Sequence, residues 1–156
     1  MHSRFLVVVL AVAFGCDGAE SYGDELSDPQ LPPRGSVDLA AWLDEGHYLA
    51  WRCETAQHPA RPGSGHGPNR ICSNELLATA STDVFPVGAA AVKEVWSGTS
   101  IRLFAVARKV EPTGGGDAWY WYEGKGDDIV ANGEGDSTCT SCHSRAPRDF
   151  VFTVVE

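Results

Sequence analysis

The fold class is decided by two neighbouring stretches, Ala89-Ala-Ala-Val-Lys-Glu-Val-Trp96 and Ile101-Arg-Leu-Phe-Ala-Val-Ala-Arg-Lys-Val110. Each contains two valines and one aromatic residue, which favour strands, and both are bounded by turn-forming residues. Ser97-Gly98 between them indicates a break in the pattern. We therefore expect two strands that are neighbours in an antiparallel sheet.

The segments after this pair extend the sheet. Glu111–Gly116 is rich in glycine and proline and predicts a hairpin turn or longer loop. The aromatic run Ala118–Tyr122 predicts a third strand, and Ile129–Ala131 a fourth. Phe150–Val154 is expected to close the sheet.

The segments before the pair are shorter. Ser36 is expected to cap a helix of about ten residues whose apolar side carries Leu39, Trp42 and Leu43. Four further elements are expected: a strand over Tyr48–Cys53, a loop over 58–69, a short extended piece over Arg70–Cys72, and a brief helix that Ser73 caps and that runs through Ala80. The prediction is a mainly β domain over residues 36–156, a small antiparallel sheet with two short helices.

The N-terminus has the pattern of an export signal. Met1–Arg4 carries positive charge, and Phe5–Phe14 is an apolar run too short to span a bilayer as a helix. Residues 1–15 are therefore expected to be a signal peptide. Gly15-Cys16 is typical of a bacterial lipoprotein, so Cys16 is the expected lipid anchor; ordinary cleavage after Ala13 is the alternative.

Residues 16–35 are acidic and rich in glycine, proline and serine. Such a composition cannot bury a core, so we expect a flexible tether between lipid and domain. Removal of residues 1–15 would move the formal charge from −9 to −10, because Arg4 is lost and no acid is. That acidity argues against nucleic-acid binding and against docking on anionic lipid through basic patches.

The five cysteines divide by context. Cys16 is assigned to the lipid, and Cys139 and Cys142 belong to a separate motif. Cys53 and Cys72 remain, and an exported compartment favours their pairing. We expect a structural disulfide, with two buried free thiols as the alternative.

Cys139-Thr-Ser-Cys142-His143 has the C-x-x-C-H spacing of c-type haem attachment. Thiols at this spacing can add to the two vinyl groups of one haem, and the adjacent histidine is then held at the iron. Half of a zinc site is one alternative, but Cys53 and Cys72 lack the spacing of a second half. A dithiol redox motif is another, but only 13 residues follow His143. The sequence predicts one covalent haem c, with His143 as its iron ligand.

The ligand on the other face of the iron can be predicted from the methionine content of the sequence. Electron-transfer cytochromes c usually hold iron with histidine and methionine, and the sequence's one methionine is Met1. Six other side chains are possible ligands: His47, His58, His66, Lys93, Lys109 and Lys125. We favour a five-coordinate iron that is open to a small ligand.

From about Trp42 onward the chain resembles the cytochrome P-460 family. The resemblance consists of an ordered set of pieces: Asn69-Arg-Ile71, Phe85-Pro-Val-Gly88, Ala91-Val-Lys-Glu-Val95, the strand Ala118–Tyr122, the Cys139–His143 motif and Asp149-Phe-Val-Phe-Thr153. It implies a small, usually dimeric β fold with five-coordinate haem. Cytochromes P-460 oxidise hydroxylamine and carry a lysine cross-link to haem, whereas cytochromes c′-beta lack the cross-link and bind gases such as nitric oxide.

Three residues acquire roles through that resemblance. Lys93 matches the cross-linking lysine, and a buried neutral amine would be nucleophilic. Phe104 falls where P-460 enzymes place a proton-relaying carboxylate, which favours the c′-beta kind of pocket; Glu94 is a replacement acid to consider. Arg70 matches an arginine near the haem that could pair with a propionate.

The sequence thus predicts a periplasmic, lipid-anchored cytochrome that binds or oxidises a small nitrogen species such as nitric oxide or hydroxylamine. Its expected partners are that ligand, an electron-transfer protein and a second copy of the chain. A non-catalytic electron carrier with bis-histidine ligation is the alternative. Whether the protein turns over a substrate is left open.

Overall fold

The centre of the fold is a hairpin in the computed structural model, which describes residues 31–156. Strand β3 (Ala90–Ser97) pairs with β4 (Ser100–Lys109) in antiparallel register, so that Lys93 lies opposite Ala105 and Glu94 opposite Phe104. The pairing of these two stretches is therefore confirmed. The remaining strands are β1 (Arg52–Cys53), β2 (Asn69–Ser73), β5 (Trp119–Lys125) and β6 (Asp128–Glu134).

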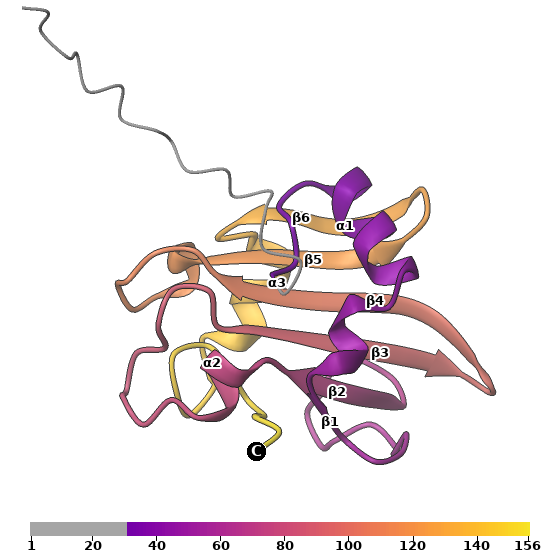
Figure 1. Ribbon diagram of the computed structural model, residues 1–156, viewed down its shortest axis with the longest axis horizontal. Helices are drawn as coiled ribbons and strands as arrows, with labels where there is room; N and C mark the ends of the chain where they lie inside the picture. The colour runs from indigo at the N-terminus through magenta and orange to yellow at the C-terminus, as the bar shows by residue number, and fades with distance from the viewer. Residues whose placement is uncertain (1–30) are drawn as a thin grey trace, which may run out of the picture.

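The six strands form one antiparallel sheet in the order of the sequence, β1 to β6. Its helices are short: α1 (Ser36–Asp44), α2 (Glu75–Ala78) and α3 (Ser137–His143), with 3-10 turns η1 (His47–Ala50) and η2 (Gly116–Ala118). In Figure 1, α1 and η1 cross one face of the sheet, whereas the C-terminal segment lies on the other. The predicted class, mainly β and antiparallel, is confirmed; a third helix is added.

Each face of the sheet has its own core because alternate residues of a strand point to opposite sides. On the first face, Val92, Phe104 and Tyr122 pack under the buried side of α1. The α1 contribution is the predicted set, Leu39, Trp42 and Leu43. On the second face, Ala91, Ala107, Trp119 and Trp121 pack with Phe85, Val151 and Cys139. We call these the α1 face and the α3 face.

Both predicted helix caps were displaced by one residue. Ser36 is the first helical residue, and Gly35 precedes it with φ of 98°, a backbone angle that favours glycine. Asn74, not Ser73, caps α2, and its side chain accepts a hydrogen bond from the Leu77 N–H. Ser73 instead accepts one from the Val155 N–H and so ties the chain end to β2.

Two predicted strands are wrong in part or whole. Tyr48–Ala50 lies in the 3-10 turn, after Gly46 in the left-handed region, so only Arg52–Cys53 of that stretch pairs. Phe150–Val154 does not join the sheet. Asp149 and Phe150 have φ of 37° and 66°, which turns the chain back on itself, and only an Arg148–Val151 bridge forms.

The domain also begins earlier than predicted. The Pro32 carbonyl accepts a hydrogen bond from the buried Arg108 guanidinium, and the Gly35 N–H donates to the Tyr120 hydroxyl. Arg34 pairs with Glu134 of β6 at 2.7 Å. Residues 32–35 are therefore part of the domain and not of the tether. The predicted signal peptide, Cys16 anchor and residues 16–30 of the tether lie outside the described residues.

Candidate functional site

The Cys139–His143 motif lies on α3, a helix that the sequence analysis missed. Its first turn is capped by Asp136, whose carboxylate accepts a hydrogen bond from the Thr138 N–H at 2.9 Å. Aspartate followed by Ser-Thr is a recognisable N-cap signal and could have predicted the helix start. Residues three and four apart lie on the same side of a helix. Cys142 and His143 follow Cys139 by three and four positions, so all three side chains can contact the same ligand. Both thiols are free and half-buried.

α3 sits close against the sheet because Gly116 has no side chain. A β-carbon at that position would lie 2.6 Å from Thr140 Cγ2 and 2.9 Å from the Phe150 ring. Neither distance is compatible with normal packing. Gly116 therefore allows the motif helix to pack closely against the η2 turn that leads into β5.

His143 is held in a defined orientation. Its Nδ1 lies 2.7 Å from the Phe150 carbonyl oxygen, so Nδ1 carries the proton and donates. Trp121 packs against the ring at 4.7 Å and Phe152 at 5.3 Å between centroids. Burial lowers the pKa of His143, which keeps the ring neutral. Its Nε2 then has a lone pair available for a metal.

A cavity of about 300 Å³ adjoins this histidine, within the range of small-molecule and cofactor sites. Its lining includes Arg61, His66, Lys93, Glu123, Cys142 and His143. A smaller hollow beside it shares Lys93 and His143 and is walled by apolar side chains, among them Ala91, Ala105, Ala107 and Trp121. The site thus combines a cavity lined mostly by polar residues with a smaller adjoining hollow whose walls are mostly apolar.

Lys93 faces this cavity from β3. Burial, with the nearby Arg61 charge as a further cause, lowers the pKa of Lys93 from 10.5 to about 8. A sizeable fraction of the amine is therefore neutral near physiological pH, which makes it a potential nucleophile. Lys93 and the Cys139–His143 motif, 46 to 50 positions apart in the sequence, line one cavity.

Phe104 does not line this cavity, so its predicted place in the pocket is wrong. It lies on the α1 face, 5.9 Å from the Tyr48 ring. The strand residue that faces the cavity beside Lys93 is its partner Ala105. The error is an offset of one residue, which in a strand reverses the face.

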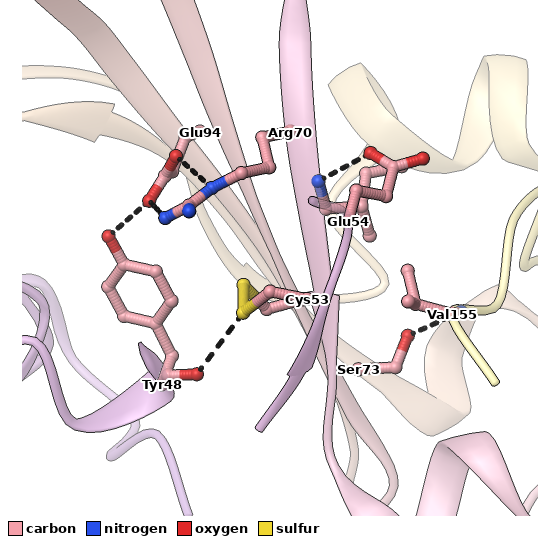
Figure 2. Close-up of a disulfide and its surroundings, with 9 residues drawn as sticks. Tyr48, Cys53, Glu54, Arg70, Ser73, Glu94 and Val155 are labelled. Carbon is pink, nitrogen blue, oxygen red and sulfur yellow. Dashed lines mark hydrogen bonds and ion pairs between the residues drawn. A yellow bond between two sulfur atoms is a disulfide. The ribbon is translucent and has the colours of Figure 1, made fainter. Parts of the chain in front are cut away.

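Arg70 also points to the α1 face, and the prediction that it binds a haem propionate is wrong. Its Nε and Nη2 donate to the two carboxylate oxygens of Glu94 at 2.8 and 2.6 Å, as Figure 2 shows. The Tyr48 hydroxyl donates to the same carboxylate at 2.7 Å. Glu94 is therefore a buried structural acid and not a replacement relay. The guanidinium at the cavity is that of Arg61.

Glu123 is a cavity residue that the sequence analysis missed. It lies on β5 opposite Ala105, and burial raises the pKa of its carboxyl group. Its Oε1 is 3.8 Å from His66 Nδ1. Glu123 is two positions after Trp121 on the same strand, so the two side chains point to the same face of the sheet. The alternation of side chains along Trp119–Glu123 could therefore have predicted that Glu123 faces the cavity.

The three histidines named as possible ligands have different surroundings. His47 contacts Glu45 and stacks on Trp42, and His58 contacts Glu54 and the Pro59 carbonyl. Neither lines the cavity near His143. His66 lines it, and burial together with nearby positive charge lowers the pKa of His66 to about 3, so the ring is neutral.

A disulfide joins Cys53 of β1 to Cys72 of β2, which lie opposite each other with Cα atoms 4.0 Å apart (Figure 2). It fixes the edge of the sheet to the strand that carries Arg70. Glu54, the residue after Cys53, accepts hydrogen bonds from the Ile71 N–H and from Arg61. The disulfide thus lies next to the residue that anchors the cavity's arginine.

The chain matches no protein-family model, no curated protein and no solved structure. Within residues 31–156 no helix is both long and apolar enough to cross a membrane. The same part of the chain has no cluster of three or more His, Cys, Asp or Glu side chains able to hold a metal ion.

Proposed function

We propose that this chain is an exported mono-haem c-type cytochrome of the P-460-like kind, whose iron binds a small nitrogen ligand. The observation that carries the proposal is the convergence of Cys139, Cys142, His143 and Lys93 on one cavity. The donor set fits a covalent haem. It offers two free thiols, a neutral histidine with Nε2 available, and an apolar wall for a large ring.

The residues would divide the work as follows. Cys139 and Cys142 would each add an S–H bond across one vinyl group, and burial keeps the Cys139 thiol protonated by raising its pKa to about 12. His143 Nε2 would be the axial ligand, oriented by the Phe150 carbonyl. Arg61, at the cavity, is the residue placed to pair with a propionate. The haem itself would supply the iron on which the small ligand binds.

The open coordination position is supported by the apolar walls of the smaller hollow beside the cavity. Ala91, Ala105 and Ala107 are too small and apolar to ligate iron, and their side chains leave room for a small ligand. Electron transfer to or from a partner protein would then accompany any turnover. Glu123, a half-buried carboxyl with a raised pKa, is the group that could move a proton during hydroxylamine oxidation.

Lys93 is the candidate for a haem cross-link. A bond between its Nζ and a haem meso carbon loses two protons and two electrons, so it requires a two-electron oxidant such as a peroxide from outside the chain. Its partly neutral amine meets the first requirement, a nucleophile directed at the cavity. The cross-link therefore remains part of the proposal, as do lipid anchoring at Cys16, the periplasmic location and the homodimer.

A second candidate, a bis-histidine electron carrier, is favoured by one observation. His66 lines the same cavity as His143 and is neutral, as an iron ligand must be. It is the histidine through which bis-histidine ligation would occur.

Addition of carbon monoxide and of nitric oxide to the dithionite-reduced protein separates the two candidates. An open iron predicts rapid Soret shifts that are the same in wild type and His66→Ala. Bis-histidine ligation predicts no binding, or slow binding that His66→Ala accelerates. His58→Ala is the matched control, because His58 lies away from the cavity. Failure of both gases to bind both proteins would contradict the proposed function.

A further inference from the structure

A buried ion pair lies behind the haem motif and is not used by the proposed chemistry. Lys109, the last residue of β4, directs Nζ to Asp149 Oδ2 at 2.6 Å, and the two side chains are 0% and 1% exposed. The ammonium also lies 4.9 Å from the Trp119 ring centroid. Charges so deeply buried are costly unless well paired, so the geometry of this pair is tightly constrained.

Asp149 connects three segments. The same Oδ2 accepts a hydrogen bond from the Phe85 N–H at 3.0 Å, which joins the Phe85–Gly88 turn to the C-terminal segment. Asp149 itself has φ of 37° and Phe150 has φ of 66°. Asparagine and aspartate tolerate such angles, whereas a phenylalanine adopts them only where its surroundings enforce them.

The enforced turn has a consequence for the axial histidine. It is the Phe150 carbonyl, within this turn, that accepts the hydrogen bond from His143 Nδ1. Lys109 is therefore connected to His143 in three steps. Lys109 pairs with Asp149, Asp149 is bonded to Phe150 through one peptide unit, and the Phe150 carbonyl accepts the hydrogen bond from His143.

We propose that the Lys109–Asp149 pair is a positioning clamp for His143, which fixes the Phe150 carbonyl against Nδ1 and so sets the strength of the iron–histidine bond. The inference rests on the proposed function, because it concerns the ligand to the haem. A hydrogen bond to the distant nitrogen of a metal-bound histidine raises its basicity and fixes its ring, and loss of such a partner typically weakens metal binding about 10–100-fold.

The test compares two double variants. Lys109→Met/Asp149→Gly removes the clamp without leaving an unpaired charge, and glycine accepts the positive φ. Lys109→Met/Asp149→Asn is the conservative partner, since asparagine also tolerates the angle and can still accept from the Phe85 N–H. Lys125→Met, on an exposed lysine of β5, is the matched control.

Two readouts report on positioning: the iron–histidine stretching frequency of the ferrous protein by resonance Raman, and the midpoint potential. The glycine variant is expected to show a lower frequency. It should also show a potential higher by about 59 mV if its preference for ferric iron falls tenfold. The asparagine variant, which lacks the ion pair but can keep the hydrogen bond from the Phe85 N–H, should shift both readouts in the same direction by less. Lys125→Met should stay near wild type. Should the glycine variant fail to fold, Lys109→Met alone must shift both readouts in the same direction.

Wild-type values of both readouts in the folded glycine variant, whatever its melting temperature, would overturn the clamp and reduce the pair to a structural role. If the glycine variant does not fold, wild-type values of both readouts in Lys109→Met would overturn the clamp in the same way. A wild-type protein without covalent haem would overturn the proposed function and the clamp together, and the absorption spectrum distinguishes that outcome at once.

Discussion

Replacement of Arg70 by methionine should destabilise the domain without changing the Soret spectrum of the proposed haem. The guanidinium is the bidentate partner of Glu94, a carboxylate that is 2% exposed at its side chain. In Arg70→Met the carboxylate keeps only the Tyr48 hydroxyl as partner among the contacts seen here. A buried charge that loses its counter-charge is among the more costly defects that one substitution can create.

The magnitude follows from the burial of the pair. Loss of one partner of a buried ion pair costs about 3–5 kcal/mol. The Arg70 side chain is 26% exposed, so water can partly solvate the Glu94 carboxylate in the variant, and the lower end of about 3 kcal/mol is expected. For a domain of this size that lowers Tm by roughly 10–15 °C. Arg70→Met/Glu94→Gln, which removes both charges, should recover most of the loss.

Thermal and urea unfolding by circular dichroism, with the Soret spectrum recorded in parallel, gives the two readouts. Arg61→Met is the matched control, because its guanidinium lies at the cavity and its loss should alter haem content or spectrum. An unchanged Tm for Arg70→Met, or a changed Soret band with unchanged stability, would refute the assignment of Arg70 to the α1 face.

Three further predictions concern the same scaffold. Cys53→Ser/Cys72→Ser should lower the free energy of unfolding by roughly 3 kcal/mol, and a reducing agent should then have no further effect on the melt. Gly116→Ala should weaken haem incorporation, measured as the Soret-to-protein absorbance ratio, because the new methyl group would contact Thr140 of α3; full incorporation would contradict the close approach. Burial alone would raise the pKa of Glu54, but hydrogen bonds from the Ile71 N–H and Arg61 outweigh burial and lower this pKa below 4.5. The ionised Glu54 therefore stabilises the fold above pH 4.5, and this stabilisation is lost as the pH falls below that value. Glu54→Gln should therefore be less stable at pH 7 and show a shallower acid loss in urea titrations between pH 5 and 3, whereas parallel curves would argue against the network.

Strand-favouring composition between turn signals was sufficient to predict strands β3, β4 and β5. In these strands, the buried apolar residues in the core of the α1 face are even-numbered. The apolar residues of the same strands that pack in the core of the α3 face are odd-numbered. The assignment of single residues to a face was less secure. Phe104 and Arg70 were placed by resemblance, and a shift of one position was enough to reverse both.

The missed elements depend on tertiary contacts. α3 consists of serine, threonine, cysteine and one histidine, none of them a strong helix former, and it lies against the sheet beside Gly116. Phe150–Val154 has the composition of a strand, yet the Lys109–Asp149 pair turns the chain away from the sheet. No local pattern encodes a pairing between positions 40 residues apart.

The central claim is that one haem is attached at Cys139 and Cys142, and mass spectrometry of a tryptic digest tests it most directly. Protein from a host that attaches haem c should be reduced and alkylated before digestion. The Gly126–Arg145 peptide is expected to carry the mass of one haem and no alkylated cysteine. A Lys93 cross-link would add the Ile71–Arg102 peptide to the same species. A haem-free Gly126–Arg145 peptide with both cysteines alkylated would contradict the account.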